Sequence, residues 1–360
     1  MDFTADQIGD QRGRLVLITG ANSGLGLETA KALSAHGADV ILACRGEAKA
    51  RAAMDEVRAA GGTGALHFEA LDLSDLASVS ACATRVLATY PRLDVLVNNA
   101  GIMVPPRGRT RDGFETQLGT NHFGHFALTA QLLPLLEKTP GARIVTVSSI
   151  MHRFGKMRFD DLGFERGYVA WLAYGQSKLA NLLFTFELGR RLTRAGSHVL
   201  SLAAHPGYAA TNLQVHDLMS RTLNPVAAQS AAMGALPSLY AAVSPDVVQG
   251  GYYGPQSFGG MRGYPGRASA SGRARNQACH RSTAHIDRLG LARGFVVAEP
   301  HLRCGIGVLR WYSVAWHRLL RQIGIARGCG IRGAIRGLHW CIHLISLGHG
   351  RAIGVAVPAL

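Results

Sequence analysis

Short, wholly apolar segments alternate with amphipathic stretches along the first 200 residues, and this alternation constrains the fold more than any other feature of the sequence. A parallel strand covered on both faces has no polar side, so its sequence is continuously apolar. Such strands separated by helices predict an α/β fold: a Rossmann-type, doubly wound parallel sheet with helices on both faces. The expected strands are residues 15–18, 40–43, 66–70, 95–97, 144–147 and 199–203.

The segments between these strands carry helical periodicity. We expect helices over about residues 25–36, 48–60, 75–89, 115–137 and 172–192. Residues 250–255, with the sequence Gly-Gly-Tyr-Tyr-Gly-Pro, are expected to form a loop, because glycine and proline interrupt regular structure.

The charge is distributed unevenly. The chain has a formal net charge of +15, yet residues 277–360 hold eleven arginines, no lysine and two acids, a balance of +9. This segment is also rich in His, Cys and Trp, and it shows neither helical nor strand periodicity. We therefore treat it as an atypical, poorly ordered basic tail, separate from residues 1–276.

Three hypotheses about this tail are open. The leading hypothesis is an out-of-frame translation, since 33 arginines against five lysines in the whole chain indicate a GC-rich coding sequence. The Arg/Trp/His mixture could instead bind anionic lipid or nucleic acid. Cys279, Cys304, Cys329 and Cys341 could also bind a metal ion, although no Cys-x-x-Cys occurs. Because the basic residues form no stripe, we expect no nucleic-acid partner.

The sequence offers no targeting signal. Residues 1–13 are polar, and no stretch reaches the roughly 18 apolar residues that a spanning helix needs. Cys44 and Cys82 are isolated, which suits a reducing compartment. We expect a cytoplasmic protein without a membrane span, and a homodimer is left open.

A glycine-rich turn follows the first strand. Its sequence is Thr19-Gly20-Ala21-Asn22-Ser23-Gly24-Leu25-Gly26. The glycines let the backbone approach a pyrophosphate, and the N–H groups that begin the next helix bind its oxygens. The turn therefore predicts a dinucleotide site, although a plain tight turn could have the same sequence.

At the exit of the second strand, Arg45 would favour a ribose 2′-phosphate, whereas Asp39 lies at the strand entrance. We thus predict NADP(H) over NAD(H), with a solvated arginine as the alternative.

A tyrosine–lysine pair opens the last predicted helix. Tyr174 and Lys178 are four residues apart and share a helix face. A nearby ammonium favours the phenolate, which would bring a phenol of ordinary pKa near 10 into the range useful for proton transfer. Ser148 and Ser149 end an apolar strand, at the edge where open α/β sheets bind ligands.

In combination these motifs resemble a known family. The glycine turn, Asn98-Asn99-Ala100-Gly101, Ser149, the Tyr174/Lys178 pair and His205-Pro206-Gly207 occur together and in order. Over about residues 10–275 the sequence resembles the short-chain dehydrogenase/reductase family, and its spacing resembles the retinol-dehydrogenase-like and WW-domain-oxidoreductase-like branch. The resemblance implies one NAD(P)-binding domain over residues 1–276, a substrate loop at about 208–229, and hydride transfer between nicotinamide and a small hydrophobic carbonyl or alcohol.

The resemblance also implies roles for individual residues. Tyr174 would be the general acid/base, Lys178 would lower its pKa, Ser149 would bind the substrate oxygen, and Asn121 would hold a relay water. Asp72 would contact the adenine. The expected cofactor-binding residues are Gly20, Asn22, Ser23, Gly24, Leu25, Gly26, Arg45, Asp72, Leu73, Asn98, Ala100, Gly101, Tyr174, Lys178, Pro206, Gly207 and Thr211.

Simpler structural roles stay open for several of these positions. Asn98 and Asn99 could cap a strand end, and Asp72 could belong to a helix N-cap. His122, His125 and His205 are expected to be packed or hydrogen-bonded rather than catalytic, and the first segment has no metal-ligand spacing. The rival function is a catalytically impaired nucleotide-binding or regulatory protein on the same fold.

Overall fold

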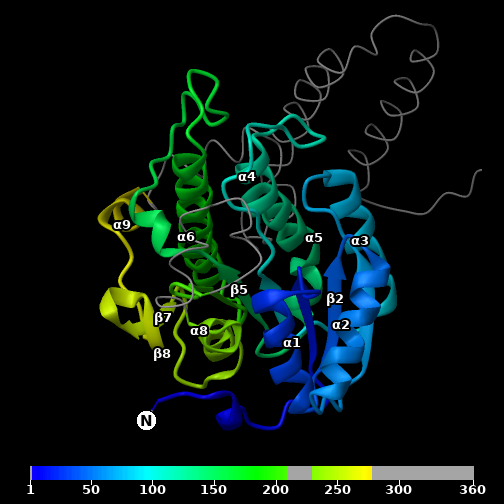
Figure 1. Cartoon of the computed structure of the whole chain (residues 1–360). Helices are drawn as coiled ribbons and strands as arrows, with labels where there is room; N and C mark the ends of the chain where they lie inside the picture. Colours follow the sequence, from blue (N-terminus) through cyan, green and yellow to red (C-terminus); the bar gives the residue numbers. More distant parts are fainter. Residues whose placement is uncertain (1, 210–228, 278–360) are drawn as a thin grey trace, which may run out of the picture. The chain divides into compact units, whose positions relative to one another are not determined.

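The computed structural model describes residues 2–209 and 229–277 (Figure 1). Thr211, most of the predicted substrate loop and all but the first residue of the predicted tail lie outside these ranges. Within them the chain forms an eight-stranded sheet in the order β3-β2-β1-β4-β5-β6-β7-β8. The strands are β1 (Leu15–Thr19), β2 (Asp39–Cys44), β3 (Leu66–Ala70), β4 (Val95–Asn98), β5 (Arg143–Val147), β6 (Leu200–Ala204), β7 (Tyr252–Ser257) and β8 (Arg262–Arg267).

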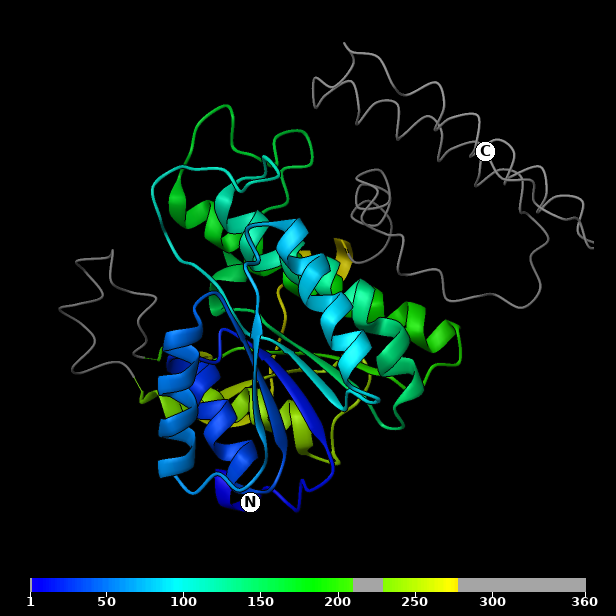
Figure 2. The same ribbon diagram turned by 90° about the vertical axis from the view of Figure 1, so that its right-hand side faces the viewer.

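Helices cover both faces of this sheet (Figure 2). One face packs against α1 (Gly24–Ala35), α2 (Glu47–Ala59) and α8 (Ala231–Val243). The other packs against α3 (Leu76–Thr89), α5 (Gly124–Lys138) and α6 (Ala170–Arg194). Two shorter helices are α4 (Thr116–Leu118), which precedes α5, and α9 (Gly272–Gln277), which follows β8. The predicted Rossmann-type fold is confirmed.

The central strand β1 shows why its sequence is wholly apolar. Val16 and Ile18 point into the core beneath α1 and α8, whereas Leu15 and Leu17 point into the core beneath α3 and α5. All four side chains are buried. Both faces are therefore removed from water, and burial of such side chains contributes roughly 1.5–3 kcal/mol each.

The C-terminal end of the sheet differs from the sequence prediction. Residues 250–255 were expected to form a loop, yet Tyr252–Ser257 is β7, which pairs parallel with β6 and antiparallel with β8. The loop prediction is wrong because local glycine and proline signals were outweighed by pairing with β6. Pro255 is compatible with this, because β6 pairs only with Tyr252 and Tyr253.

The order of the strands leaves a crevice at the carboxyl ends of the two central strands β1 and β4. From β1 the chain proceeds outward to β2 and β3, then returns to the other side of β1 to form β4. The helices that follow β1 and β4 cover opposite faces, so the carboxyl ends of these two strands lie at a topological switch point, where α/β sheets bind ligands.

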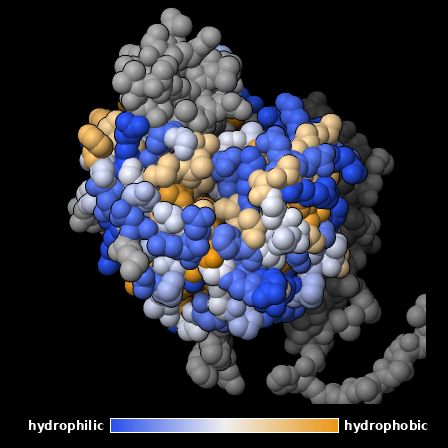
Figure 3. Space-filling model, turned by 60° about the horizontal axis from the view of Figure 1, so that its bottom comes forward, coloured by the Kyte–Doolittle hydropathy of each residue, from blue (hydrophilic) through white to orange (hydrophobic). Residues whose placement is uncertain are grey.

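The surface of the described residues is mixed in polarity. On the face shown in Figure 3, hydrophobic side chains lie in small groups between hydrophilic ones. A search of the described helices finds none with the length and apolar content that crossing a bilayer requires.

Candidate active site and nucleotide pocket

A pocket of about 860 Å³ lies at the carboxyl ends of β1, β2 and β4. We call it the nucleotide pocket, and its size is in the range of known ligand sites. Its lining includes thirteen of the predicted site residues: Gly20, Asn22, Ser23, Gly24, Leu25, Arg45, Asp72, Leu73, Ala100, Gly101, Tyr174, Lys178 and Pro206.

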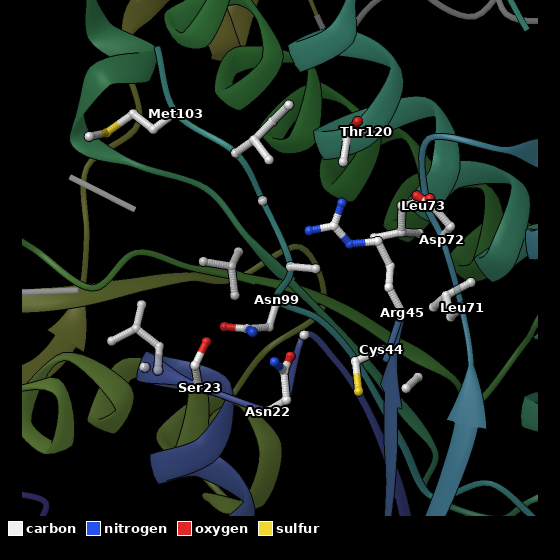
Figure 4. Close-up of a pocket in the computed structure, with 18 of the residues that line it drawn as sticks. Asn22, Ser23, Cys44, Arg45, Leu71, Asp72, Leu73, Asn99, Met103 and Thr120 are labelled. Atoms are coloured by element: carbon white, nitrogen blue, oxygen red, sulfur yellow. The ribbon is translucent and has the colours of Figure 1, made fainter. Parts of the chain in front are cut away.

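The glycine turn forms one wall of the pocket. Gly20 has φ of +67°, a left-handed conformation that favours glycine, and a Cβ there would lie 2.9 Å from the Ala100 Cβ. The side chains of Asn22 and Ser23 point toward the pocket from the start of α1 (Figure 4). Gly26 does not line the pocket. A Cβ at Gly26 would lie 2.5 Å from Asn99 Nδ2, so this glycine allows α1 to pack closely on the turn.

Arg45 occupies the place that the sequence predicted. It follows β2, is exposed, and points into the pocket (Figure 4). Lys49, in the first turn of α2, also lines the pocket and was missed by the sequence interpretation. Neither cation forms an ion pair with another described residue, whereas Arg51 nearby pairs with Glu47. Asp39 lies at the opposite end of β2, where its carboxylate accepts a hydrogen bond from the Ala65 N–H.

The turn after β3 forms the opposite wall. Asp72 lines the pocket, and its Oδ1 accepts hydrogen bonds from the Ser74 N–H (2.9 Å) and hydroxyl (2.7 Å). The residue also lies close before α3, whose N-cap is Asp75. Thr120 adds a polar atom that the sequence interpretation missed: its hydroxyl is buried against this pocket and has no hydrogen-bond partner among the described residues.

Of the two adjacent asparagines, the structure brings Asn99 and not Asn98 to the pocket. Asn98 is the last residue of β4 and is fully buried, and its Nδ2 donates to Thr129 Oγ1 (2.9 Å). The predicted contact of Asn98 with the adenosine is therefore not supported by its position. Gly207 also lies outside the lining: with φ of +67° it turns the chain after Pro206, and a Cβ would lie 2.3 Å from the Met261 carbonyl oxygen.

The predicted catalytic side chains converge where β5 ends and α6 begins. Ser149 caps a short 3-10 turn, Ile150–Arg153, and its hydroxyl also hydrogen-bonds the Tyr174 phenol. Lys178 donates from Nζ to the Val147 carbonyl (3.2 Å) and lies 5.7 Å from the centre of the Tyr174 ring. The i,i+4 spacing thus places the ammonium beside the phenol, as the sequence indicated.

The acidity of these groups differs from the sequence expectation. Burial raises the pKa of Tyr174 to about 12, and the hydrogen bond from Ser149 offsets only part of that. Burial also lowers the pKa of Lys178 to about 8. A cation at this distance was expected to lower the pKa of Tyr174, but desolvation of the phenolate by burial dominates. Tyr174 is therefore protonated at neutral pH.

Asn121 lies in a five-residue π-helical turn, Gly119–Phe123, between α4 and α5. Its side chain binds Ile102 twice: Oδ1 accepts from the Ile102 N–H (2.8 Å), and Nδ2 donates to the Ile102 carbonyl (3.0 Å). Nδ2 also donates to Ser177 Oγ (3.0 Å). A Cβ at Gly101 would lie 3.3 Å from Asn121 Oδ1 and 3.4 Å from Lys178 Nζ. Glycine at this position leaves room between the two polar groups.

Ile102, Met103 and Pro105 give the nucleotide pocket an apolar side. These residues carry no charge and belong to no motif, so the sequence interpretation missed them. No group of three or more His, Cys, Asp or Glu side chains within residues 2–209 and 229–277 could hold a metal ion.

Three histidines near the site are buried and neutral. Burial lowers the pKa of His122 to about 4 and that of His125 and of His205 to about 3. His122 hydrogen-bonds Asn181, and His205 packs against the ring of Tyr252. They are packed, hydrogen-bonded groups, as expected.

Together, the switch-point pocket, the glycine turn and the Ser149–Tyr174–Lys178 cluster define a nucleotide-dependent oxidoreductase on a Rossmann-type fold. The family model for short chain dehydrogenase matches residues 14–219. The chain belongs to the short-chain dehydrogenase family, and the predicted enzyme class is confirmed.

Relatives support the same assignment. The chain is 44% identical to mouse "Retinol dehydrogenase 12" over 239 residues, which covers 65% of this chain and 75% of that protein. It is 45% identical to mouse "Retinol dehydrogenase 14" over 265 residues, with 68% and 79% covered. The crystal structure of an uncharacterized protein from Mycobacterium Paratuberculosis is 41% identical, with a TM-score of 0.66, and covers 84% of this chain and 100% of its own. The predicted resemblance to the retinol-dehydrogenase-like branch is confirmed.

The buried histidines generate a prediction about stability. Above about pH 6.5 they are neutral in both the folded and the unfolded chain. As the pH falls from 6.5 toward 4, the unfolded chain binds protons that the folded chain does not, so the free energy of unfolding falls. The slope is roughly 1.4 kcal/mol per pH unit for each such histidine. Urea unfolding at pH 7 and pH 5 should show a lower midpoint at pH 5.

The controls are two glutamine substitutions. His122→Gln should reduce the difference between the two midpoints, because it removes one buried histidine. His67→Gln, on the partly exposed strand β3, should leave the difference unchanged. Equal midpoints at pH 7 and pH 5 for the wild type would contradict the interpretation.

Proposed function

We propose that this chain is an NADP(H)-preferring oxidoreductase that interconverts a hydrophobic, retinol-like alcohol and its carbonyl compound. The observation that carries the proposal is that one pocket is lined at one end by Tyr174, whose phenol hydrogen-bonds Ser149, and at the other by Arg45 and Lys49, two cations without ion-pair partners among the described residues. The apolar side of the pocket and the names of the related retinol dehydrogenases support the substrate class.

The residues present fit a dinucleotide cofactor. The glycine turn and the N-terminus of α1 would hold the pyrophosphate, and Arg45 and Lys49 would hold a 2′-phosphate. Asp72 and the unpartnered Thr120 hydroxyl would face the adenosine. When bound, the nicotinamide would donate or accept the hydride.

The side chains of the protein would move the proton. In the reducing direction, the protonated Tyr174 gives its phenolic proton to the carbonyl oxygen of the substrate, and Ser149 orients that oxygen by a hydrogen bond. In the oxidising direction, Tyr174 as the phenolate takes the proton of the alcohol. The Lys178 ammonium stabilises the phenolate that reduction leaves behind.

Tyr174→Phe tests the proton donor. It keeps the ring and removes the phenolic oxygen, so kcat for reduction of a hydrophobic aldehyde should fall by about 10²–10⁴-fold. Binding of NADPH, followed by its fluorescence, should stay within about threefold. The matched control Tyr90→Phe, at the end of α3, should keep full activity. Retention of most activity in Tyr174→Phe would refute the assignment.

The two pKa values predict the pH dependence of the reduction. Tyr174 stays protonated up to about pH 12, so it limits the rate only at very high pH. Lys178 loses its ammonium charge above about pH 8. The kcat for reduction should therefore be constant below pH 7 and decline as the pH rises through about 8. A stopped-flow pH profile checks this, and a profile that rises between pH 7 and 9 would contradict it.

Arg45→Ala tests the preference for NADP(H). Loss of a charged hydrogen bond to a 2′-phosphate should weaken NADPH binding by about tenfold to a hundredfold, and NADH binding by less than about threefold. Lys49→Ala should act in the same direction. The control is Arg51→Ala. Arg51 lies in α2, pairs with Glu47 and does not line the pocket, so its loss should change neither affinity. Unchanged discrimination in Arg45→Ala would remove this assignment.

A further inference from the structure

The segment Asn99-Ala100-Gly101-Ile102 forms a wall of the nucleotide pocket, and it is held at both ends by hydrogen bonds. At one end Thr19 Oγ1 accepts from the N–H groups of Asn99 and Ala100, both at 2.9 Å. At the other end the Asn121 side chain binds the N–H and carbonyl of Ile102. Thr19 and Asn121 are thus the two anchors of this wall.

A single buried side chain bridges the two anchors. His125 lies in the first turn of α5 and is 1% exposed. Its Nδ1 is 3.0 Å from the Asn121 carbonyl oxygen, and its Nε2 is 2.8 Å from Thr19 Oγ1. The strand β1 and the π-helical turn, about 100 residues apart in sequence, are therefore connected through one imidazole.

The donors and acceptors that connect Thr19, His125 and Asn121 follow from the chemistry of the groups. A carbonyl oxygen only accepts, so Nδ1 of His125 carries the proton. His125 is buried, with its pKa lowered to about 3 by desolvation and, in part, by the neighbouring Lys178, so the ring is neutral and Nε2 accepts. Thr19 must then donate its hydroxyl proton to Nε2, which leaves its lone pairs for Asn99 and Ala100. The alternative acceptor of that proton, the Val97 carbonyl, is more distant at 3.4 Å.

We propose that His125 is a positioning residue that sets the spacing between Thr19 and Asn121, and thereby the shape of the pocket wall at residues 99–102. The consequence for function rests on the nucleotide pocket being the cofactor site of the proposed function. His125 itself is not part of the pocket lining. It acts through the two anchors.

Substitutions of His125 separate the two bonds. An asparagine amide reaches the position of Nδ1, so His125→Asn keeps the donor to the Asn121 carbonyl and loses the acceptor for Thr19. A glutamine amide reaches the position of Nε2, so His125→Gln keeps the acceptor for Thr19 and loses the donor to Asn121. His125→Phe fills the same space and loses both bonds.

Amide hydrogen exchange on the cofactor-free chain, resolved to single residues, is the first readout. His125→Asn should accelerate exchange at Asn99 and Ala100 only, and His125→Gln at Ile102 only. His125→Phe should accelerate exchange at all three, by about tenfold, as expected for the loss of roughly 1.4 kcal/mol of local stability. The matched control is His122→Phe, which removes a buried histidine from the π-helical turn just before α5 and leaves both anchors intact.

The second readout is binding of NADPH by titration of its fluorescence. His125→Phe should weaken binding by about tenfold, the two single-bond variants should weaken it less, and His122→Phe should keep wild-type affinity. The proposal is overturned if exchange at the three amides is unchanged in His125→Phe, if His122→Phe accelerates it equally, or if the exchange pattern appears without any loss of affinity. A wild-type chain that binds no dinucleotide would refute the proposed function, while the exchange pattern would still decide whether His125 spaces the anchors.

Discussion

The parallel pairing of β1 with both β2 and β4 is the constraint on which the rest of the structure depends. Because the chain leaves β1 in one direction and returns on its other side, the helices after β1 and β4 cover opposite faces of the sheet and leave a gap at the carboxyl ends of these strands. The nucleotide pocket occupies this gap. The glycine turn, Arg45 and the 99–102 segment all lie around it because each directly follows one of these three strands.

Burial determines the chemistry of the side chains around this gap. The polar groups behind the pocket are removed from water, and each neutral or charged form persists only where hydrogen bonds compensate for the lost hydration. Lys178 keeps the Val147 carbonyl as an acceptor, and His122 and His125 keep amide and carbonyl partners. A buried network that is satisfied in this way is rigid, since the loss of any member leaves another polar group unpaired. The Ser149–Tyr174–Lys178 cluster therefore lies against a framework with fixed hydrogen-bond directions.

Much of this arrangement could be predicted from the sequence. The buried strands up to β6 and the long helix α6 were recognised because their periodicity is strong, and thirteen of the predicted site residues line one pocket. What failed depended on tertiary context. Residues 250–255 have turn composition, and only pairing with β6 makes them a strand. Asn98 was predicted to border the adenosine, but it is the last residue of β4 and is buried in the core, and the next residue, Asn99, lines the pocket instead.

The pKa of Tyr174 also could not be predicted from the sequence, because it depends on burial in the folded protein. The i,i+4 spacing correctly placed Lys178 near the phenol, and from proximity alone one expects the phenolate to be favoured. Burial, however, penalises the charged form of both groups, raising the pKa of Tyr174 to about 12 and lowering that of Lys178 to about 8. A sequence pattern shows which charges are neighbours, but not how much water they lose. The pair is thus a protonated phenol beside a weakly basic amine, an arrangement suited to giving a proton to a carbonyl oxygen.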